Sequence, residues 1–272
     1  MNSETIKEIP ELFKYKRPEL PSDCVFSISP SQIEKFFTYP SIWYMEQVLG
    51  TTATFLGNTA TVTGTICHHI YKSVTEKITV TREDINKQLL EYHSMKPELE
   101  LDVNQIMIDY PLVTSVVVND YTILADTVNT MIKCEHNVVG KVSDGIYIGG
   151  STDRIEGDCI VDYKTVAKLP NQDKIPFGYK IQLLAYAYAA RKMGFEINRI
   201  RIVYGIKPTV KLPARCVVVT EEIDFIADKL INDTLQLIGE TVLMAKDNPK
   251  IVHLLFKSLD LKQIKEITNV SS

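Results

Sequence analysis

The sequence predicts an α/β protein, either as one large domain or as a sheet-containing core with a helical annex. Helix-like patterns fill most of the chain before residue 134, whereas alternating runs joined by tight turns follow it. A further helix-like segment separates these runs from another alternating run, as in proteins that cover a sheet with helices. The chain has 272 residues, 45% of them hydrophobic and 24% charged, and can bury a substantial core.

The N-terminal part is expected to consist of an extended leader over residues 1–24 and a helical region over residues 25–133. Prolines among charged residues make the leader a poor helix or strand former. In the run 29–32, a serine, a proline at the first helical position and a glutamine form the pattern of a capped helix start. Pro40 then restarts the chain, so two short helices are expected before Gly50.

The rest of the helical region is expected to cover one side of the sheet. Pro111 is expected to end a short helix, because proline removes a backbone donor. Apolar residues recur at helical spacing after it. The expected helices span residues 59–77, 81–94, 102–108 and 112–133.

Residues 134–272 are expected to form the core that carries the chemistry. Glycine-containing turns at 143–145 and 156–158 separate three alternating runs, which predicts successive hairpins. Gly194 is expected to end the helix that follows, and Thr220 with two glutamates to open the last long helix. The expected strands are 134–142, the runs on either side of 156–158, 199–206 and 215–219, and the expected helices are 178–193 and 220–246.

Two carboxylates and an amine are expected to converge around the turn 156–158. Asp153 and Asp162 lie on the two strands that this turn joins, and Lys164 shares a strand face with Asp162 because side chains alternate. The dipeptide 149–150 is Gly-Gly, and backbone without side chains is expected where a ligand comes close.

This arrangement suits phosphodiester hydrolysis. Mg²⁺ and Mn²⁺ prefer oxygen ligands, which carboxylates on adjacent strands supply at a defined separation. A lysine beside them can orient an attacking water, help to remove its proton or balance the developing charge. A glycosidase would also place two acids together, but the lysine and the basic residues after it favour a phosphate substrate.

The charge distribution favours a polyanionic partner more than the net charge does. The formal net charge of the chain is −4. Between Lys164 and Arg215, however, eleven residues are basic and two are acidic. A locally positive surface suits a phosphate-binding groove, although a solvated charged face would produce the same pattern.

Cysteine usage and the lack of long apolar runs indicate an intracellular, cytoplasmic protein without a membrane partner. The five cysteines are scattered singly with no CxxC pair, which is typical of free thiols in a reducing compartment. The first residues contain no apolar run of signal-peptide length, and no run approaches the roughly 20 apolar residues of a membrane span.

Four short motifs follow one another in the chain: GTICH at 64–68, GSTDRI at 150–155, VDYKT at 161–165 and QLLAY at 182–186. Each is weak alone, but their order and spacing together resemble the PD-(D/E)xK nuclease superfamily over most of the chain after the leader. Within it, the motifs are similar to those of the RecB-like exonuclease branch. That branch includes CRISPR-associated and phage exonucleases and the mitochondrial genome maintenance exonuclease.

The resemblance implies a restriction-endonuclease-like core, in which helices flank a central mixed sheet, together with an N-terminal helical region that contributes the motif histidine. It implies Mg²⁺ or Mn²⁺ as the cofactor. Iron–sulfur members of the branch have a cysteine before a proline where this chain has Tyr39-Pro40, and further cysteines near the C-terminus, whereas none follows Cys216 here. No iron–sulfur cluster is therefore expected.

The resemblance also implies roles for individual residues. Lys164 would serve the attacking water, and Gln182 and Tyr186, four apart on one helix face, would orient Lys164 or the scissile phosphate. A polar position on an amphipathic helix is the alternative for both. Glu135 stands where relatives often have an acidic residue, although a surface charge would look the same. The implied metal ligands are His68, Asp153, Asp162 and the Tyr163 carbonyl, and the residues expected to contact DNA are Arg154, Lys168, Lys174 and Lys180.

The expected function is that of a metal-dependent DNA nuclease, with an exonuclease favoured, that leaves 5′-phosphates. It would act on single strands or duplex ends in replication, recombination or repair, including in a phage-infected cell, and a replication or recombination protein is a candidate partner. Two alternatives stay open, a DNA-end-binding recombination module with little turnover and an endonuclease. The intact set of Asp153, Asp162 and Lys164 speaks against the binding module, because binding alone does not need that geometry.

Overall fold

The computed structural model describes residues 9–14, 17–47, 58–122, 131–170 and 173–248. Several expectations lie wholly or partly outside these ranges: the start of the leader, the end of the second short helix near Gly50, residues 123–130 of the expected helix 112–133, and the segment from residue 249 onward. Within the described ranges, no helix is both long and apolar enough to cross a bilayer.

A six-stranded mixed sheet forms the centre of the described residues, as the sequence predicts. The strands follow the order β1-β3-β4-β5-β6, and β2 also pairs with β3. Pairing is parallel between β1 and β3 and between β4 and β5, and antiparallel in the other pairs. The strands are β1 (Phe26–Ile28), β2 (Ile132–Ser143), β3 (Ile146–Glu156), β4 (Cys159–Val166), β5 (Arg199–Ile206) and β6 (Arg215–Glu222).

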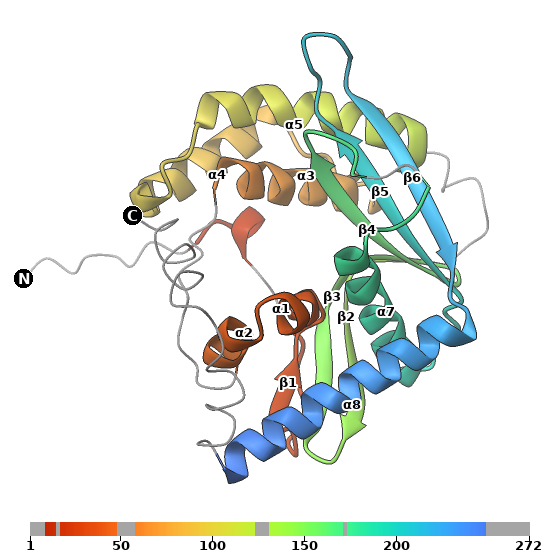
Figure 1. The fold of residues 1–272 in the computed structure, drawn as a ribbon. Helices are drawn as coiled ribbons and strands as arrows, with labels where there is room; N and C mark the ends of the chain where they lie inside the picture. Colours follow the sequence, from red (N-terminus) through yellow and green to blue (C-terminus); the bar gives the residue numbers. More distant parts are fainter. Residues whose placement is uncertain (1–8, 15–16, 48–57, 123–130, 171–172, 249–272) are drawn as a thin grey trace, which may run out of the picture.

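The sheet forks at the hairpin between β3 and β4 (Figure 1). β4 pairs with β3 only at Arg154, Ile155 and Glu156, whereas β2 accompanies β3 along its whole length. Beyond Arg154 the two strands diverge, and β1 lies beside the start of β3 instead. Asp153 and Asp162 occupy the first position past the last pair, so both carboxylates lie in the angle of the fork.

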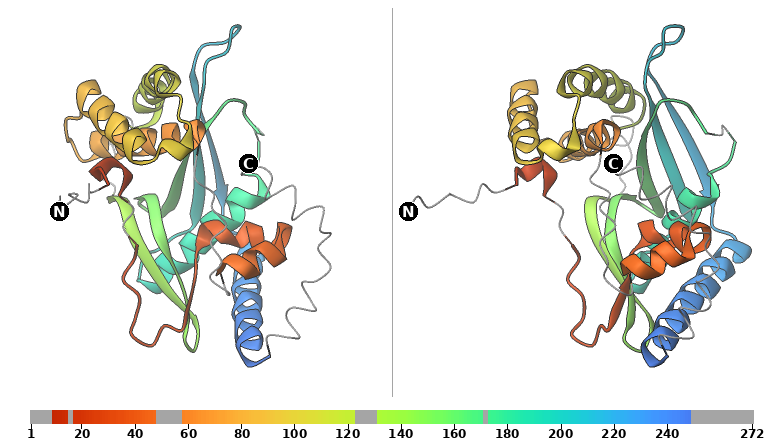
Figure 2. Two further views of the ribbon diagram at one scale, coloured as in Figure 1. Left: turned by 90° about the vertical axis from the view of Figure 1, so that its left-hand side faces the viewer. Right: turned by 60° about the vertical axis from the view of Figure 1, so that its left-hand side comes forward.

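Helices cover both faces of the sheet (Figures 1 and 2). One face packs against α3 and α5, with α4 packed on α5, and α5 continues into a π-helical turn, η4. α7 crosses the other face, with α1, α2 and α8 beside it. The helices are α1 (Ile33–Thr38), α2 (Pro40–Gln47), α3 (Thr59–Thr75), α4 (Arg82–Met95), α5 (Val103–Val117), η4 (Val118–Thr122), α7 (Phe177–Lys192) and α8 (Phe225–Asp247), with short 3-10 turns at Glu11–Phe13, Pro30–Gln32 and Pro97–Leu99.

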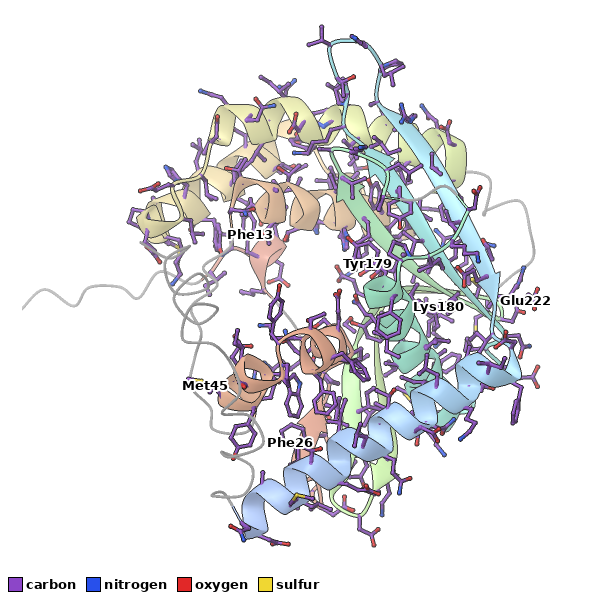
Figure 3. All side chains as sticks on the ribbon, viewed as in Figure 1. Phe13, Phe26, Met45, Tyr179, Lys180 and Glu222 are labelled. Atoms are coloured by element: carbon purple, nitrogen blue, oxygen red, sulfur yellow. The ribbon has the colours of Figure 1, made fainter. Side chains whose placement is uncertain are left out.

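β1 was not predicted, because the sequence assigns residues 25–133 to a helical region. Three residues are too few for strand alternation to be recognised, and the partner of β1 lies more than a hundred residues later in β3. Phe26 of β1 points toward α2, where its ring centroid lies 6.3 Å from that of Trp43 (Figure 3). Helical structure begins at Pro30, as expected, but as the 3-10 turn Pro30–Gln32, and α1 follows from Ile33; Ser29 stands at the N-cap position without a side-chain capping hydrogen bond within the described chain.

Two helix boundaries also differ from the prediction. α5 runs through Pro111, because the Met107 carbonyl that loses its usual backbone donor accepts a hydrogen bond of 3.2 Å from Nη2 of Arg82. The last long helix begins at Phe225 and not at residue 220, since β6 continues to Glu222. Asp224 caps this helix by accepting a hydrogen bond of 2.7 Å from the backbone of Ala227.

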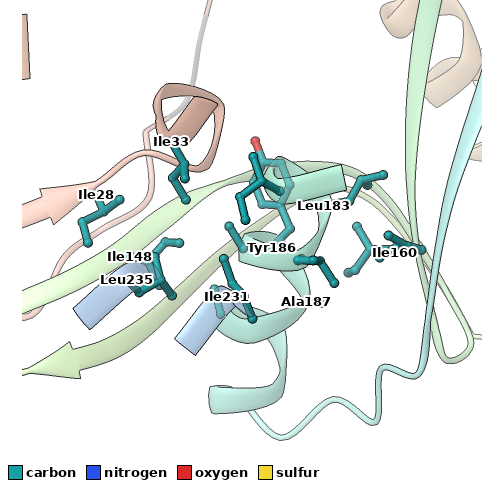
Figure 4. Packing of buried hydrophobic residues seen from close by; sticks show 14 of the residues in the cluster. Ile28, Ile33, Ile148, Ile160, Leu183, Tyr186, Ala187, Ile231 and Leu235 are labelled. Carbon is teal, nitrogen blue, oxygen red and sulfur yellow. The ribbon is translucent and has the colours of Figure 1, made fainter. Parts of the chain in front are cut away.

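The core beneath α7 includes Tyr186, Ile148 and Ile160 (Figure 4), and it explains the Gly-Gly dipeptide. A Cβ on Gly150 would lie 3.0 Å from Cε1 of Tyr186 and 3.1 Å from Cδ of Pro30. A Cβ on Gly149 would meet side chains of the N-terminal segment at 3.3 Å. The glycines thus allow close packing within the fold, and the ligand-based interpretation of them is wrong.

Gly205→Ala is expected to destabilise the protein by about 1–3 kcal/mol, because it would overpack the contact between β5 and α5. A Cβ at this position would lie 2.4 Å from Cγ1 of Val113. Urea unfolding would measure the loss, with Gly64→Ala as the control, because a Cβ there meets nothing within 4 Å. Gly64 lies inside α3, where alanine is the better helix former, so that control should be neutral or stabilising by up to about 1 kcal/mol. Equal losses in the two variants would contradict the packing argument.

Candidate active site

The fork between β3 and β4 holds the two carboxylates. Asp162 is 5% exposed, and Asp153 is half-buried. Oδ2 of Asp153 accepts a hydrogen bond of 2.8 Å from the backbone N–H of Tyr163. This contact crosses the fork just past the last backbone pair, so a side chain joins β3 to β4 where the ladder ends.

His68 reaches the fork from α3. Its Nδ1 lies 3.3 Å from Oδ1 of Asp153, and its Nε2 lies 2.8 Å from the carbonyl oxygen of Tyr163. α3 is capped by Asn58, and its residue Cys67 is fully buried against the sheet, which orients the helix. Of the two adjacent histidines, His68 is therefore the one that faces the carboxylates.

Lys164 completes the group on β4. Its Nζ lies 2.8 Å from Oδ2 and 3.1 Å from Oδ1 of Asp162. The two residues are two apart on one strand and leave the same face, as the sequence predicts. The fork thus brings together an imidazole, two carboxylates and an ammonium group.

The surroundings shift the pKa values of the two carboxyl groups in opposite directions. Burial raises the pKa of Asp162, and the ammonium of Lys164 offsets only part of this effect. Burial acts in the same direction on Asp153, but His68 and Lys164 outweigh it, so the pKa of Asp153 is lowered. Burial opposes the charge of Lys164, yet Asp162 and Asp153 hold the pKa of Lys164 above its ordinary value. The pKa values of the two carboxyl groups are therefore shifted in opposite directions, upward for Asp162 and downward for Asp153.

The donor set at the fork suits a hard divalent cation. Two carboxylates, a carbonyl oxygen and an imidazole are ligands that Mg²⁺ or Mn²⁺ accepts. In the described part of the chain, no three His, Cys, Asp or Glu side chains form a ready-made metal cluster. The donors instead contact neighbouring groups: His68 contacts the Tyr163 carbonyl, and Asp162 contacts the ammonium of Lys164. Their chemistry fits a metal, and these internal contacts would have to be exchanged for it.

α7 contributes a contact to Lys164 that the sequence did not predict. The ring centroid of Tyr179 lies 5.1 Å from Nζ of Lys164. Gln182 is half-buried one turn further along, and Tyr186 is 8% exposed within the apolar core, beside Gly150. Helical spacing was an available signal, because Tyr179 precedes Gln182 and Tyr186 by three and seven residues on the same helix face.

Arg154 does not face a ligand, and its assignment to DNA contact is wrong for this structure. Its side chain has no exposed surface, because Tyr121, Tyr163 and Glu156 enclose the guanidinium. Nε lies 3.3 Å from Oε2 of Glu156, and the guanidinium carbon lies 5.7 Å from the Tyr121 ring centroid. Arg154 thus supports the strands from behind the fork, next to Tyr163.

Most of the basic stretch is neutralised by acids that lie elsewhere in the chain. Lys180, expected to contact DNA, pairs with Glu221 at 2.6 Å. Lys168 and Lys174 are exposed and form no ion pair among the described residues. The excess of basic residues in the sequence therefore overstates the unpaired positive charge that this part of the surface presents. The further pairs that reduce it are Lys164–Asp162, Arg191–Asp228, Arg199–Asp158, Arg201–Glu156 and Lys207–Asp109.

Glu135 lies on β2 and pairs with Lys72 of α3 at 2.6 Å. Its backbone has a φ of +43°, a left-handed conformation that is uncommon for a residue with a side chain. The Lys72 pair ties α3 to the edge strand one helical turn after His68. A role of Glu135 in the active site stays a prediction.

Comparison with known proteins gives the family. No curated protein sequence matches the chain. A crystal structure from Eubacterium rectale, of a protein described as a candidate exonuclease, is 14% identical, with 85% of this chain and 87% of that chain covered and a TM-score of 0.52. The alkaline exonuclease LHK-Exo from Laribacter hongkongensis is 10% identical, with coverage of 79% and 87% and a TM-score of 0.37. At these identities the first likeness concerns the fold alone, and the second is too distant to support an argument. The family model for the PD-(D/E)XK nuclease superfamily matches residues 27–250, and the chain belongs to that superfamily.

Proposed function

We propose that the protein is a Mg²⁺- or Mn²⁺-dependent DNA exonuclease that hydrolyses phosphodiester bonds and leaves 5′-phosphates. The observation that carries this proposal is the geometry of the fork. Asp153 and Asp162 lie where strand pairing ends, and both oxygens of Asp162 lie within hydrogen-bonding distance of Lys164. A group of this kind suits the hydrolysis of a phosphate ester.

Each residue of the fork has a distinct task in this proposal. His68, Asp153, Asp162 and the Tyr163 carbonyl would hold the divalent cation, which supplies Lewis acidity and lowers the pKa of a bound water. Lys164 would orient the attacking water and balance negative charge on the phosphate. The backbone hydrogen bond from Tyr163 holds Asp153 in place and does not involve another proposed ligand atom, so it can persist when the other internal contacts are exchanged.

Two features support a DNA end as the substrate. The exposed Lys168 and Lys174 follow the strand that carries Lys164, so a polyanion approaching the fork would meet positive charge there. The structure from Eubacterium rectale that shares this fold is described as that of a candidate exonuclease. Gln182 and Tyr186 are retained as proposed contacts to the scissile phosphate or to Lys164.

A time course on end-labelled DNA tests the proposal. With Mg²⁺ or Mn²⁺, linear single-stranded or duplex DNA should be degraded, covalently closed circles should survive, and EDTA should stop the reaction. The released products should carry phosphatase-sensitive 5′-phosphates. Rapid cleavage of circles would make the protein an endonuclease, and tight binding of ends without turnover at any metal concentration would identify a binding module.

A further inference from the structure

A buried tyrosine hydroxyl without a hydrogen-bond partner among the described residues belongs to Tyr204, the strand partner of Lys164. Tyr204 is 0% exposed, and among the described residues its hydroxyl oxygen has neither a donor nor an acceptor. A buried polar group left unsatisfied costs about 1–3 kcal/mol. Such a group in a native structure therefore needs an explanation.

The strand register places Tyr204 beside Lys164. The two residues are partners in the parallel pairing of β4 and β5, so their side chains leave the same face of the sheet. Burial raises the pKa of Tyr204 to about 12, with smaller effects from Tyr179, Asp162 and Lys164. The hydroxyl thus lies within electrostatic reach of the group at the fork.

α7 supplies a second tyrosine against the same ammonium. Tyr179 lies in the first turn of α7, close to the sheet (Figure 3). Its ring faces Nζ of Lys164 at 5.1 Å from the centroid. Such a cation–π contact contributes about 0.5–2 kcal/mol, and more when water is excluded.

Lys164 would need other hydrogen-bond or charge partners if Asp162 bound a divalent cation. An ammonium group has three N–H donors, and in this structure both oxygens of Asp162 lie within 3.1 Å of it. A divalent cation held by Asp162 would compete for the same oxygens. Leaving the buried ammonium without these oxygens would cost free energy unless other groups replaced them. Tyr204 is the strand partner of Lys164 on β5 and shares its sheet face, and the Tyr179 ring already contacts the ammonium, so these two residues are the candidates for such replacement.

We propose that Tyr179 and Tyr204 are positioning residues for Lys164: the Tyr179 ring holds the ammonium at the fork, and the Tyr204 hydroxyl accepts a Lys164 N–H when Asp162 engages a divalent cation. The inference rests on the role proposed above for Lys164. It also accounts for the unpartnered hydroxyl of Tyr204, which would form its hydrogen bond with Lys164 only in the metal-bound state.

NMR of the full chain, ¹³C-labelled at the lysine ε-carbon, tests the placement directly. The Lys164 signal is assigned by its disappearance in Lys164→Ala. We expect a ring-current shift that Tyr179→Phe retains and Tyr179→Leu removes. Addition of Mg²⁺ alone should move the Lys164 signal differently in Tyr204→Phe than in the unmodified protein. An ordinary lysine shift in the unmodified protein, or an identical Mg²⁺ response in Tyr204→Phe, overturns the proposal for the corresponding tyrosine.

Kinetics with linear DNA provides the second measurement. Tyr179→Leu and Tyr204→Phe should each lower kcat by about tenfold with little change in KM, and Tyr179→Phe should recover most of the loss. Tyr188→Leu is the matched control, because Tyr188 lies on the same helix and its ring stands 5.2 Å from Nζ of Lys192. An equal loss in Tyr188→Leu would overturn the proposal. If the unmodified protein cleaves no DNA, the proposed function fails, whereas the NMR experiment still decides where Lys164 is held.

Discussion

Lys164→Ala is expected to reduce Mg²⁺- or Mn²⁺-dependent DNA cleavage by about 10²–10³-fold, to near background. The variant removes the only ammonium group that contacts Asp162 among the described residues, and with it the group that would orient water and balance charge on the phosphate. Asp162→Ala should have at least as large an effect, because it removes a proposed metal ligand as well. Gel-based initial rates on linear DNA would measure both.

Measuring DNA affinity distinguishes a loss of catalysis from a loss of substrate binding. Fluorescence anisotropy in EDTA should show binding by Lys164→Ala largely kept, since the exposed Lys168 and Lys174 are unchanged. Lys229→Ala is the control for the loss of one positive charge, because Lys229 lies on α8, where it pairs with Asp233 and is 63% exposed. Unchanged cleavage by Lys164→Ala would remove Lys164 from the mechanism and with it the proposed site.

Glu156→Gln is expected to destabilise the protein by about 3–5 kcal/mol, because it leaves a buried positive charge without its counter-ion. Glu156 lies between two arginines: Oε2 is 3.3 Å from Nε of Arg154, and Oε1 is 3.3 Å from Nη1 of Arg201. Tyr121 also donates a hydrogen bond of 2.8 Å to Oε2. The side chains of Glu156 and Arg201 are 17% and 16% exposed and that of Arg154 is 0% exposed, so water can screen the charges only slightly. Urea unfolding monitored by circular dichroism would measure the change.

Asp158→Asn is the matched control, two residues later in the same hairpin. Asp158 also pairs with an arginine, Arg199, but the two side chains are 35% and 39% exposed. Pairs this exposed typically contribute less than about 1 kcal/mol, so the control should lose correspondingly little. Similar losses in the two variants would show that burial does not govern the strength of these pairs. A loss below about 1 kcal/mol in Glu156→Gln would show that Arg154 finds another partner.

Sequence reasoning succeeded where the relevant signal is local. Alternation and the glycine turns predicted β2, β3 and β4 as successive hairpins, and the helix expected at 178–193 is α7 within one residue at each end. It failed where a distant residue decides the outcome. β1 is a strand because β3 pairs with it, and α5 continues past Pro111 because Arg82 satisfies the exposed carbonyl of Met107.

The same division holds at the site. A turn at 156–158 and strand alternation are enough to bring Asp153, Asp162 and Lys164 together, because the register of a hairpin follows from a few adjacent residues. The sequence by itself thus determined the hairpin, its acids and its lysine, and its short motifs indicated the superfamily to which the chain belongs.

Only the tertiary structure decided what surrounds that hairpin. It buried Arg154 beneath Tyr121 and Tyr163, paired most of the basic stretch with acids from other elements, and set Tyr179 and Tyr204 beside Lys164. The physical reason is that burial and charge pairing arise when segments far apart in the chain pack together. Those contacts cannot be predicted from a residue's neighbours along the chain.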